Sequence, residues 1–390
     1  MNETPELRLL VCLARTTLEP AQKARAGDLV RGQLDWDRFL TLAWRHGLMP
    51  LVFNHLLNSF AELVPAQHLQ KIREDFQHNT ARNLALATEL CRVLDEFEEH
   101  GVTTIAYKGP ALAIQVYGDL KLRRFVDLDM LVRRSDVQRA GTLLAARGYH
   151  PQLQLNPAQE AMLSHSKCDR VYFREGRHFM LELHWAIVPQ YFSVALTTEA
   201  VLADCEWVKM CNSRVRVPSP EMLLLLLCVN GTKDLWTALE PVCCVHELVR
   251  RYSAMDWRLV VTLARRVGAS RMLHIGLLLA RQMFELPLPE NILTSIDADR
   301  PVKDLVREAR TRLSETEMRV PGLVEKTRFQ VWSRERGRDK VRYSVLRFLT
   351  PSYEDCSPEL PPSLSFLYYA IRPLRLLRDG LKRPTDKPVL

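Results

Sequence analysis

The sequence lacks any long apolar run. Its longest uninterrupted stretch of apolar residues extends only from Met222 to Val229, far short of the roughly 20 residues that a membrane-spanning helix requires. The first ten residues, MNETPELRLL, also lack the basic segment followed by an apolar stretch that directs export. Both absences predict a cytoplasmic protein.

Paired cysteine motifs are also missing. The nine cysteines are scattered, none forms a CxxC pair, and their odd number leaves at least one outside any disulfide scheme. This pattern favours reduced thiols in a cytosol. Cys243 and Cys244 are adjacent but have no spaced partners, so we interpret them as helix-packing residues rather than zinc ligands.

Basic residues only slightly outnumber acidic ones. The chain has 54 basic and 46 acidic residues, a formal net charge of +8. This excess suits anionic substrates such as nucleotides but equally serves solubility, and it does not predict nucleic acid as a partner. With 390 residues, of which 47% are apolar, the chain is long enough for two or three compact domains.

The hydrophobic period changes along the chain and predicts four regions. The first is helical, with Asp35 as a helix N-cap and Gly47 as a C-terminal cap. The second alternates short strands with turns and helices, one of which has Ser135 as its N-cap. The regions are 1–100 (helical), 101–217 (mixed), 218–320 (helical) and 321–390 (a basic tail punctuated by prolines). The strands are predicted at Val102–Tyr107, Phe125–Val132, Arg170–Arg174 and His178–Trp185.

The segment VDLDMLV has the strongest chemical signal. Asp127 and Asp129 stand two residues apart, so both side chains project from one face of the predicted strand. Two carboxylates on one face repel each other unless a cation lies between them. Magnesium takes oxygen ligands and usually shares one or two carboxylates with substrate phosphates. The alternative is a solvated strand edge, which an isolated Asp-x-Asp more often forms.

A later strand, HFMLELHW, offers a third carboxylate. Its residues alternate, with Glu182 and His184 on the side opposite Leu181 and Leu183. Glu182 is therefore predicted to face the aspartate pair as a third metal ligand. His184 shares that face and either orients a carboxylate or contacts a phosphate, or is simply half buried.

Upstream, AYKGPALA ends a strand at a glycine and opens a helix. Such a turn offers free backbone amides and the positive end of a helix to a triphosphate. Lys108 adds positive charge beside Gly109, and Arg123 precedes Asp127 by four residues. The alternative interpretation is a plain turn.

Together these segments resemble a known family. The run KGPALAIQVYGDLKLRRFVDLDMLV, followed by a helix to RGY and later by LELHW, is similar to the uncharacterised bacterial nucleotidyltransferase family of the DNA polymerase beta superfamily. The resemblance also covers DWDRFLTLAWRHGLMPLV before this run and MDWRLVVTLARRVGA after it. It implies an α+β fold, with a small mixed sheet as the nucleotidyltransferase core and mostly helical regions on either side.

The resemblance also implies an activity. A member of this family moves a nucleoside monophosphate from a nucleoside triphosphate to an acceptor, here unknown, and releases pyrophosphate. Asp127, Asp129 and Glu182 would bind magnesium, with two ions expected, and the nucleotide would lie against Gly109, with Lys108 neutralising its phosphates. Arg123 would add further charge.

Some positions depart from the family pattern. The wider superfamily usually has Gly-Ser where this chain has Lys108 and Gly109. Histidines are common where this chain has Asn230 and Asp234, and an aspartate is common near Cys244. These departures motivate an alternative, a catalytically degenerate protein that binds nucleotide or acts as a regulatory or scaffold partner. In the tail, SFLYYAIRPLRLLRDGLKR has the composition of an interfacial helix interrupted at Pro373, so peripheral contact with an anionic membrane and docking on the protein body are both open.

Overall fold

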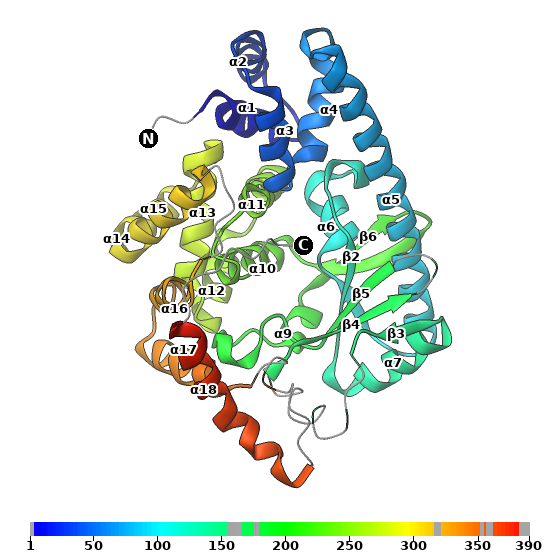
Figure 1. Cartoon of the computed structure of the whole chain (residues 1–390), viewed down its shortest axis with the longest axis vertical. Helices are drawn as coiled ribbons and strands as arrows, with labels where there is room; N and C mark the ends of the chain where they lie inside the picture. The colour runs from blue at the N-terminus through cyan, green and yellow to red at the C-terminus, as the bar shows by residue number, and fades with distance from the viewer. Residues whose placement is uncertain are drawn as a thin grey trace.

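The architecture, in a computed structural model, is a five-stranded mixed sheet with helices around it (Figure 1). This is the α+β fold that the sequence predicts. The structure describes residues 4–153, 156, 159, 166–174, 176, 179–315, 321–351, 355 and 362–381.

The sheet has the strand order β1-β2-β5-β4-β3. Its strands are β1 (Thr104–Ala106), β2 (Asp127–Val132), β3 (Tyr149–Pro151), β4 (Asp169–Arg174) and β5 (Phe179–His184). β2 and β5 run parallel, and the other neighbours are antiparallel. The register of β2 and β5 sets Asp129 beside Glu182. Because residues paired in register point to the same face of a sheet, these two carboxylates lie side by side.

The predicted strands are present with shifted ends. β4 begins one residue earlier than predicted, and His178 is outside the described residues. The other strands are shorter, and the residues expected in them that lie outside are Val102, Thr103, Tyr107, Phe125, Val126 and Trp185. The short strand β3 was not expected. Nor was the hairpin of β6 (Cys205–Met210) and β7 (Ser213–Pro218).

The helices expected between residues 6 and 99 are present. Asp35 caps α3 by accepting a hydrogen bond from the Arg38 amide at 3.0 Å, and Gly47 follows its end with φ +71°. These helices are α1 (Pro5–Leu13), α2 (Pro20–Arg31), α3 (Trp36–Arg45), α4 (Met49–Ser59) and α5 (Ala66–Glu99). The long α5 runs beside the sheet (Figure 1). From it, the Asn83 side chain donates to the Arg123 carbonyl at 2.6 Å and so fixes the segment that leads into β2.

The segment after the glycine turn, between β1 and β2, is helical, as expected. The α-helix α6 (Gly109–Leu112) continues into a wider π-helical turn, η2 (Ala113–Tyr117). Ser135, however, is not a helix N-cap. It lies in the 3-10 turn η4 (Arg134–Asp136), and α7 (Val137–Ala146) begins one residue later than a cap at Ser135 would place it.

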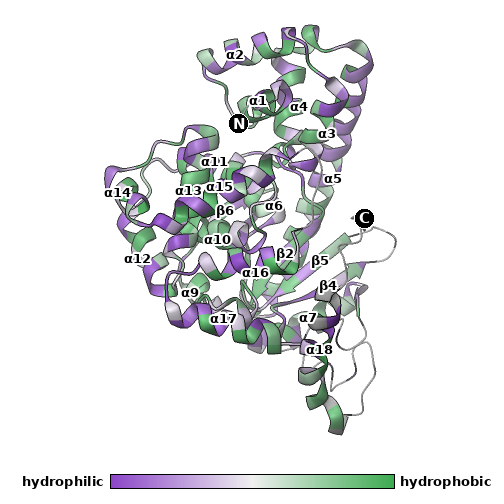
Figure 2. Ribbon diagram, turned by 60° about the vertical axis from the view of Figure 1, so that its left-hand side comes forward, coloured by the Kyte–Doolittle hydropathy of each residue, from purple (hydrophilic) through white to green (hydrophobic). Residues whose placement is uncertain are grey.

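The region after the sheet is helical, as expected. Its helices are α9 (Thr198–Ala203), α10 (Pro220–Lys233), α11 (Leu239–Arg251), α12 (Trp257–Val267), α13 (Ser270–Phe284), α14 (Glu290–Ala298), α15 (Arg300–Ser314), α16 (Leu323–Trp332), α17 (Gly337–Leu349) and α18 (Tyr368–Leu381). Most carry hydrophilic and hydrophobic residues together, as helices around a shared core do (Figure 2). Within the described residues, no helix has both the length and the apolar character to cross a membrane.

Two apolar cores hold these elements together. Helices from both ends of the chain, including α1 to α4 and α10 to α15, share one core, whereas the sheet packs with α5 and α7 in a second. Because one core contains helices from both ends of the chain, it does not delimit the four regions given by the sequence. Their division into domains stays a prediction.

In the tail, α18 does not stop at Pro373 but continues through it. This helix packs against α17. Arg372 and Arg375 bind Asp355 at 3.2 and 2.6 Å, so these two cations are engaged within the protein.

Trp236 is fully buried at the close approach of α10 and α13. Its ring leaves no room for a side chain at Gly231, where an added Cβ would meet three ring atoms at 2.5 to 2.7 Å. We expect Gly231→Ala to lower the free energy of unfolding by about 1 to 3 kcal/mol through overpacking. Urea denaturation measures this, with Gly322→Ala as the control because nothing lies within 4 Å of that Cβ. Equal losses in both variants would contradict the packing role of Trp236.

Candidate active site

A cleft of ≈ 530 Å³ opens beside β2, between the sheet and the helices. Five of the six predicted site residues line it: Lys108, Gly109, Arg123, Asp127 and Asp129. The facing wall belongs to the helical regions, which contribute Trp44, Arg45, His46, Asp234, Trp236, Thr237 and Glu240. The sheet and helices from both ends of the chain therefore form the walls of this cleft.

Asp129 is almost fully buried, with 2% of its side chain exposed. Lys108 Nζ donates to its Oδ1 at 2.8 Å, and His184 Nε2 lies 3.1 Å from the same oxygen. Burial by itself raises the pKa of Asp129, but the charges and hydrogen bonds of Lys108 and His184 outweigh it and hold this pKa below its usual range. Asp129 is therefore ionised, with two cationic partners.

Glu182 is the neighbour of Asp129 across the β2–β5 pair. His184 Nε2 also reaches Glu182 Oε2 at 3.2 Å. Burial lowers the pKa of His184, yet Tyr107 and the hydrogen bonds to Asp129 and Glu182 raise it by more, so that this pKa stands above its ordinary value. Ligand atoms of Asp129, Glu182 and His184 all lie within 4.8 Å of one another.

Asp127 begins β2 and is partly exposed to the cleft. Burial, followed by the charges of Asp129 and Glu182, raises its pKa to about 6. Two carboxylates close enough to raise the pKa of Asp127 fit a divalent cation, which would relieve the repulsion. The carboxylate oxygens suit magnesium or manganese.

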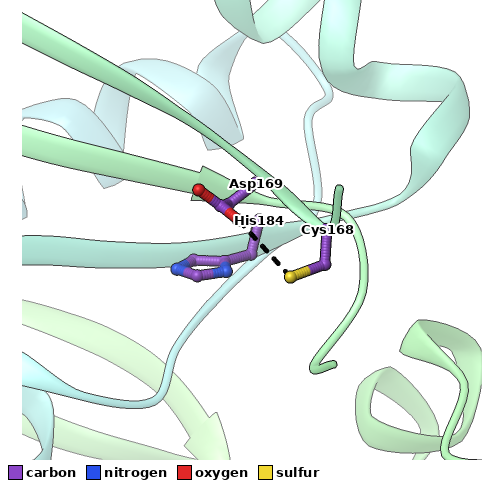
Figure 3. A group of neighbouring side chains, drawn as sticks. All are labelled: Cys168, Asp169 and His184. Carbon is purple, nitrogen blue, oxygen red and sulfur yellow. Dashed lines mark hydrogen bonds between the residues drawn. The ribbon is translucent and has the colours of Figure 1, made fainter. Parts of the chain in front are cut away.

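Two further residues lie beside His184, at the start of β4 (Figure 3). Asp169 is the register partner of His184, and the Cys168 thiol donates to Asp169 Oδ1 at 3.4 Å. Ligand atoms of Cys168, Asp169 and His184 also lie within 4.8 Å of one another. Sequence reasoning gave them no role, because only the antiparallel pairing of β4 with β5 brings them here.

Gly109 occupies a position that only glycine fits. Its φ is +51°, and an added Cβ would stand 2.9 Å from the Asp127 carbonyl oxygen. The turn after Lys108 therefore approaches the backbone of β2 closely. This contact sets Lys108 and Gly109 next to the first aspartate.

Arg123 binds a residue that the sequence did not single out. Its Nε donates to Glu240 Oε1 at 2.7 Å, and one terminal nitrogen lies 3.4 Å from the Gly109 carbonyl. Burial lowers the pKa of Arg123, but Glu240 raises it by more, so the guanidinium is held in its charged form. Glu240 could not be predicted, since it lies on α11, more than a hundred residues along the chain.

The positions that depart from the family pattern occupy different places. Asp234 ends α10 and lines the cleft. Asn230 lies one turn earlier and is not among the lining residues. Cys244 is buried behind the cleft, where its thiol donates to Glu240 Oε1 at 3.1 Å.

His46 connects the helical wall to the start of α11. Its ring is fully buried, and its Nδ1 accepts a hydrogen bond from the Leu239 amide at 3.2 Å. Burial, with a smaller contribution from Arg45, lowers the pKa of His46 to about 3. The folded protein therefore holds this imidazole neutral.

This burial makes stability depend on pH. At a pH below the ordinary pKa of histidine, the unfolded chain binds a proton at His46 and the folded chain does not. The contribution of His46 to the free energy of unfolding is therefore fully present above about pH 6.5 and is lost progressively as the pH decreases toward 3. We expect His46 to contribute a loss of roughly 1.4 kcal/mol per pH unit between pH 6 and 4. Urea unfolding of wild type and His46→Gln across this range measures it. Identical slopes in the two proteins would contradict the assignment.

The fold and cleft have the features of a nucleotidyltransferase: a small mixed sheet that presents acidic side chains of two adjacent strands. A family model described as an uncharacterised nucleotidyltransferase matches residues 32–285. The chain belongs to this family, which confirms the resemblance seen in the sequence. No curated protein matches the chain.

Proposed function

We propose that this protein transfers a nucleoside monophosphate from a magnesium-bound nucleoside triphosphate to an acceptor hydroxyl or phosphate, with release of pyrophosphate. One observation carries the proposal: the pairing of β2 with β5 brings the carboxylates of Asp127, Asp129 and Glu182 together. Burial, with the added repulsion of Asp129 and Glu182, raises the pKa of Asp127 to about 6. Membership in the nucleotidyltransferase family supports the reaction class.

Asp127, Asp129 and Glu182 would hold the metal, with two ions expected as in two-metal transfer reactions. When bound, magnesium neutralises the developing charge on the triphosphate and on the leaving pyrophosphate. His184, hydrogen-bonded to two of these carboxylates, keeps them oriented.

Lys108 and Gly109 would hold the triphosphate. Lys108 lies in the cleft with 29% of its side chain exposed, so its ammonium can neutralise phosphate charge while Asp129 stays close. The glycine turn removes the side chain that would keep phosphates from the backbone amides. Arg123, held by Glu240, adds a fixed positive charge.

The acceptor would bind against the helical wall of the cleft. Trp44, whose side chain is partly exposed, offers aromatic surface there, and Asp234 and Thr237 offer polar groups. Glu182 is the residue on the sheet that would assist deprotonation of an acceptor hydroxyl.

The absence of disulfides among the described cysteines agrees with a cytoplasmic location.

The proposal is tested by calorimetric titration of ATP, GTP, CTP and UTP with magnesium, followed by an acceptor screen for pyrophosphate release. We expect one or more nucleotides to bind only with the metal, and pyrophosphate to appear with a suitable acceptor. Lack of binding by all four would contradict the proposal. Saturable binding without pyrophosphate release in an exhaustive screen would favour the degenerate nucleotide-binding alternative.

A further inference from the structure

A second cleft, of ≈ 580 Å³, lies where the segment after β5 faces α17. It shares no lining residue with the first cleft. It begins one residue beyond His184, at Trp185, and extends through residues 186–199 to Val267 and the first half of α17. The reaction proposed above makes no use of it.

The charged side chains that line this cleft are mostly basic. Two acidic residues, Glu199 and Asp339, also line it, but Asp339 is largely buried and already lies 3.5 Å from the Arg338 guanidinium. The basic residues are Arg134, Lys167, Arg336, Arg338 and Arg342. A concave surface with charge of one sign concentrates ligands of the opposite sign.

Some of these cations are held in place. The Arg336 guanidinium donates to the carbonyl of Arg265 near the end of α12, which fixes its position. Arg134 lies over the Trp185 ring, with its guanidinium carbon 5.4 Å from the ring centroid. Within the described part of the chain, neither Arg134 nor Arg342 forms an ion pair, and both are exposed, so both can bind an anion from solution.

The other residues that line this cleft suit a small organic molecule. Trp185, Val188 and Pro189 provide apolar surface, and Thr197 and Gln190 provide polar groups. Arginine pairs with phosphate through two parallel hydrogen bonds, which makes phosphate the anion that this set of residues recognises best.

We infer that this second cleft binds a small phosphorylated molecule through Arg134 and Arg342, with Arg336 and Arg338 adding charge. The inference goes beyond nucleotidyl transfer and does not depend on it, since no metal ligand of the first cleft takes part.

The test is calorimetric titration of inorganic pyrophosphate into the full chain in EDTA at low salt, so that metal-dependent binding is absent. We expect one saturable site that weakens at least about tenfold in Arg134→Ala with Arg342→Ala, because two charge-assisted contacts are lost. Arg214→Ala is the matched control: it removes an arginine that lies 5.5 Å from the Trp207 ring centroid but lines neither cleft.

A further variant separates the two clefts. Lys108→Ala should leave pyrophosphate binding in EDTA unchanged, since Lys108 lines only the first cleft. Binding lost in Lys108→Ala and kept in the double arginine variant would overturn the inference, as would the absence of binding to wild type. Equal affinity for sulfate and pyrophosphate would also overturn it, because the cleft would then be a general anion site. Circular dichroism and urea unfolding confirm that each variant folds.

Discussion

Asp129→Asn is expected to weaken magnesium-dependent nucleotide binding at least about a hundredfold, close to 2.7 kcal/mol, and to abolish pyrophosphate release. Asn keeps the size of the side chain but removes the charge that Lys108 and His184 bind at 2.8 and 3.1 Å. A neutral amide leaves Asp127 and Glu182 with one fewer negative neighbour and so reduces their joint affinity for a cation.

The measurements are calorimetric titration of the magnesium-nucleotide complex and manganese binding followed by electron paramagnetic resonance. The second readout needs neither an acceptor nor turnover. Asp136→Asn is the control, since that aspartate ends η4 without a side-chain capping bond and lies outside the cleft. Unchanged manganese affinity in a folded Asp129→Asn protein would remove Asp129 from the metal site.

Loss of the charge also affects stability, which must be measured separately. In the variant, the Lys108 ammonium stays partly buried without its carboxylate partner, and burial of an unpaired charge is costly. Urea unfolding therefore accompanies each titration. A protein that unfolds early but binds metal normally would show that Asp129 is structural only.

The sequence predicted the parts of the site that depend on local pattern. Alternation alone put Asp127 and Asp129 on one face, and the same rule paired Glu182 with His184. The turn at Gly109 followed from its position between a strand and a helix, and the structure gives it the positive φ that favours glycine. These features are encoded within a few residues of each other.

Long-range pairing decides the remaining features. The register that sets Asp129 beside Glu182 joins strands some fifty residues apart, and alternation cannot fix it. Lys108 was expected to contact phosphates, but in the structure its nearest partner is Asp129, because the β1–β2 pairing brings them together. The contact of Arg123 with Glu240 depends on packing between the sheet region and α11, which has no signature in the sequence.

The ion pair of Arg123 with Glu240 is expected to give the second large effect. Both side chains are mostly buried, with 14% and 17% exposed, and their closest atoms lie 2.7 Å apart. Arg123→Met leaves the Glu240 carboxylate without its cation, so we expect the free energy of unfolding to fall by about 3 kcal/mol. Urea denaturation at neutral pH measures the loss, and a fall below about 0.5 kcal/mol, the scale of an ordinary surface substitution, would contradict it.

A double variant separates the structural role of Arg123 from its role toward the nucleotide. In Arg123→Met with Glu240→Gln, no buried charge is left unpaired, so most of the stability should return. If Arg123 also neutralises phosphate charge, magnesium-nucleotide binding should remain weak in the double variant although the fold is restored. Glu240→Gln alone keeps Arg123 and should therefore bind nucleotide better than the double variant. Recovery of both stability and binding in the double variant would show that Arg123 only joins the sheet to α11, and that Lys108 and the glycine turn hold the phosphates without it.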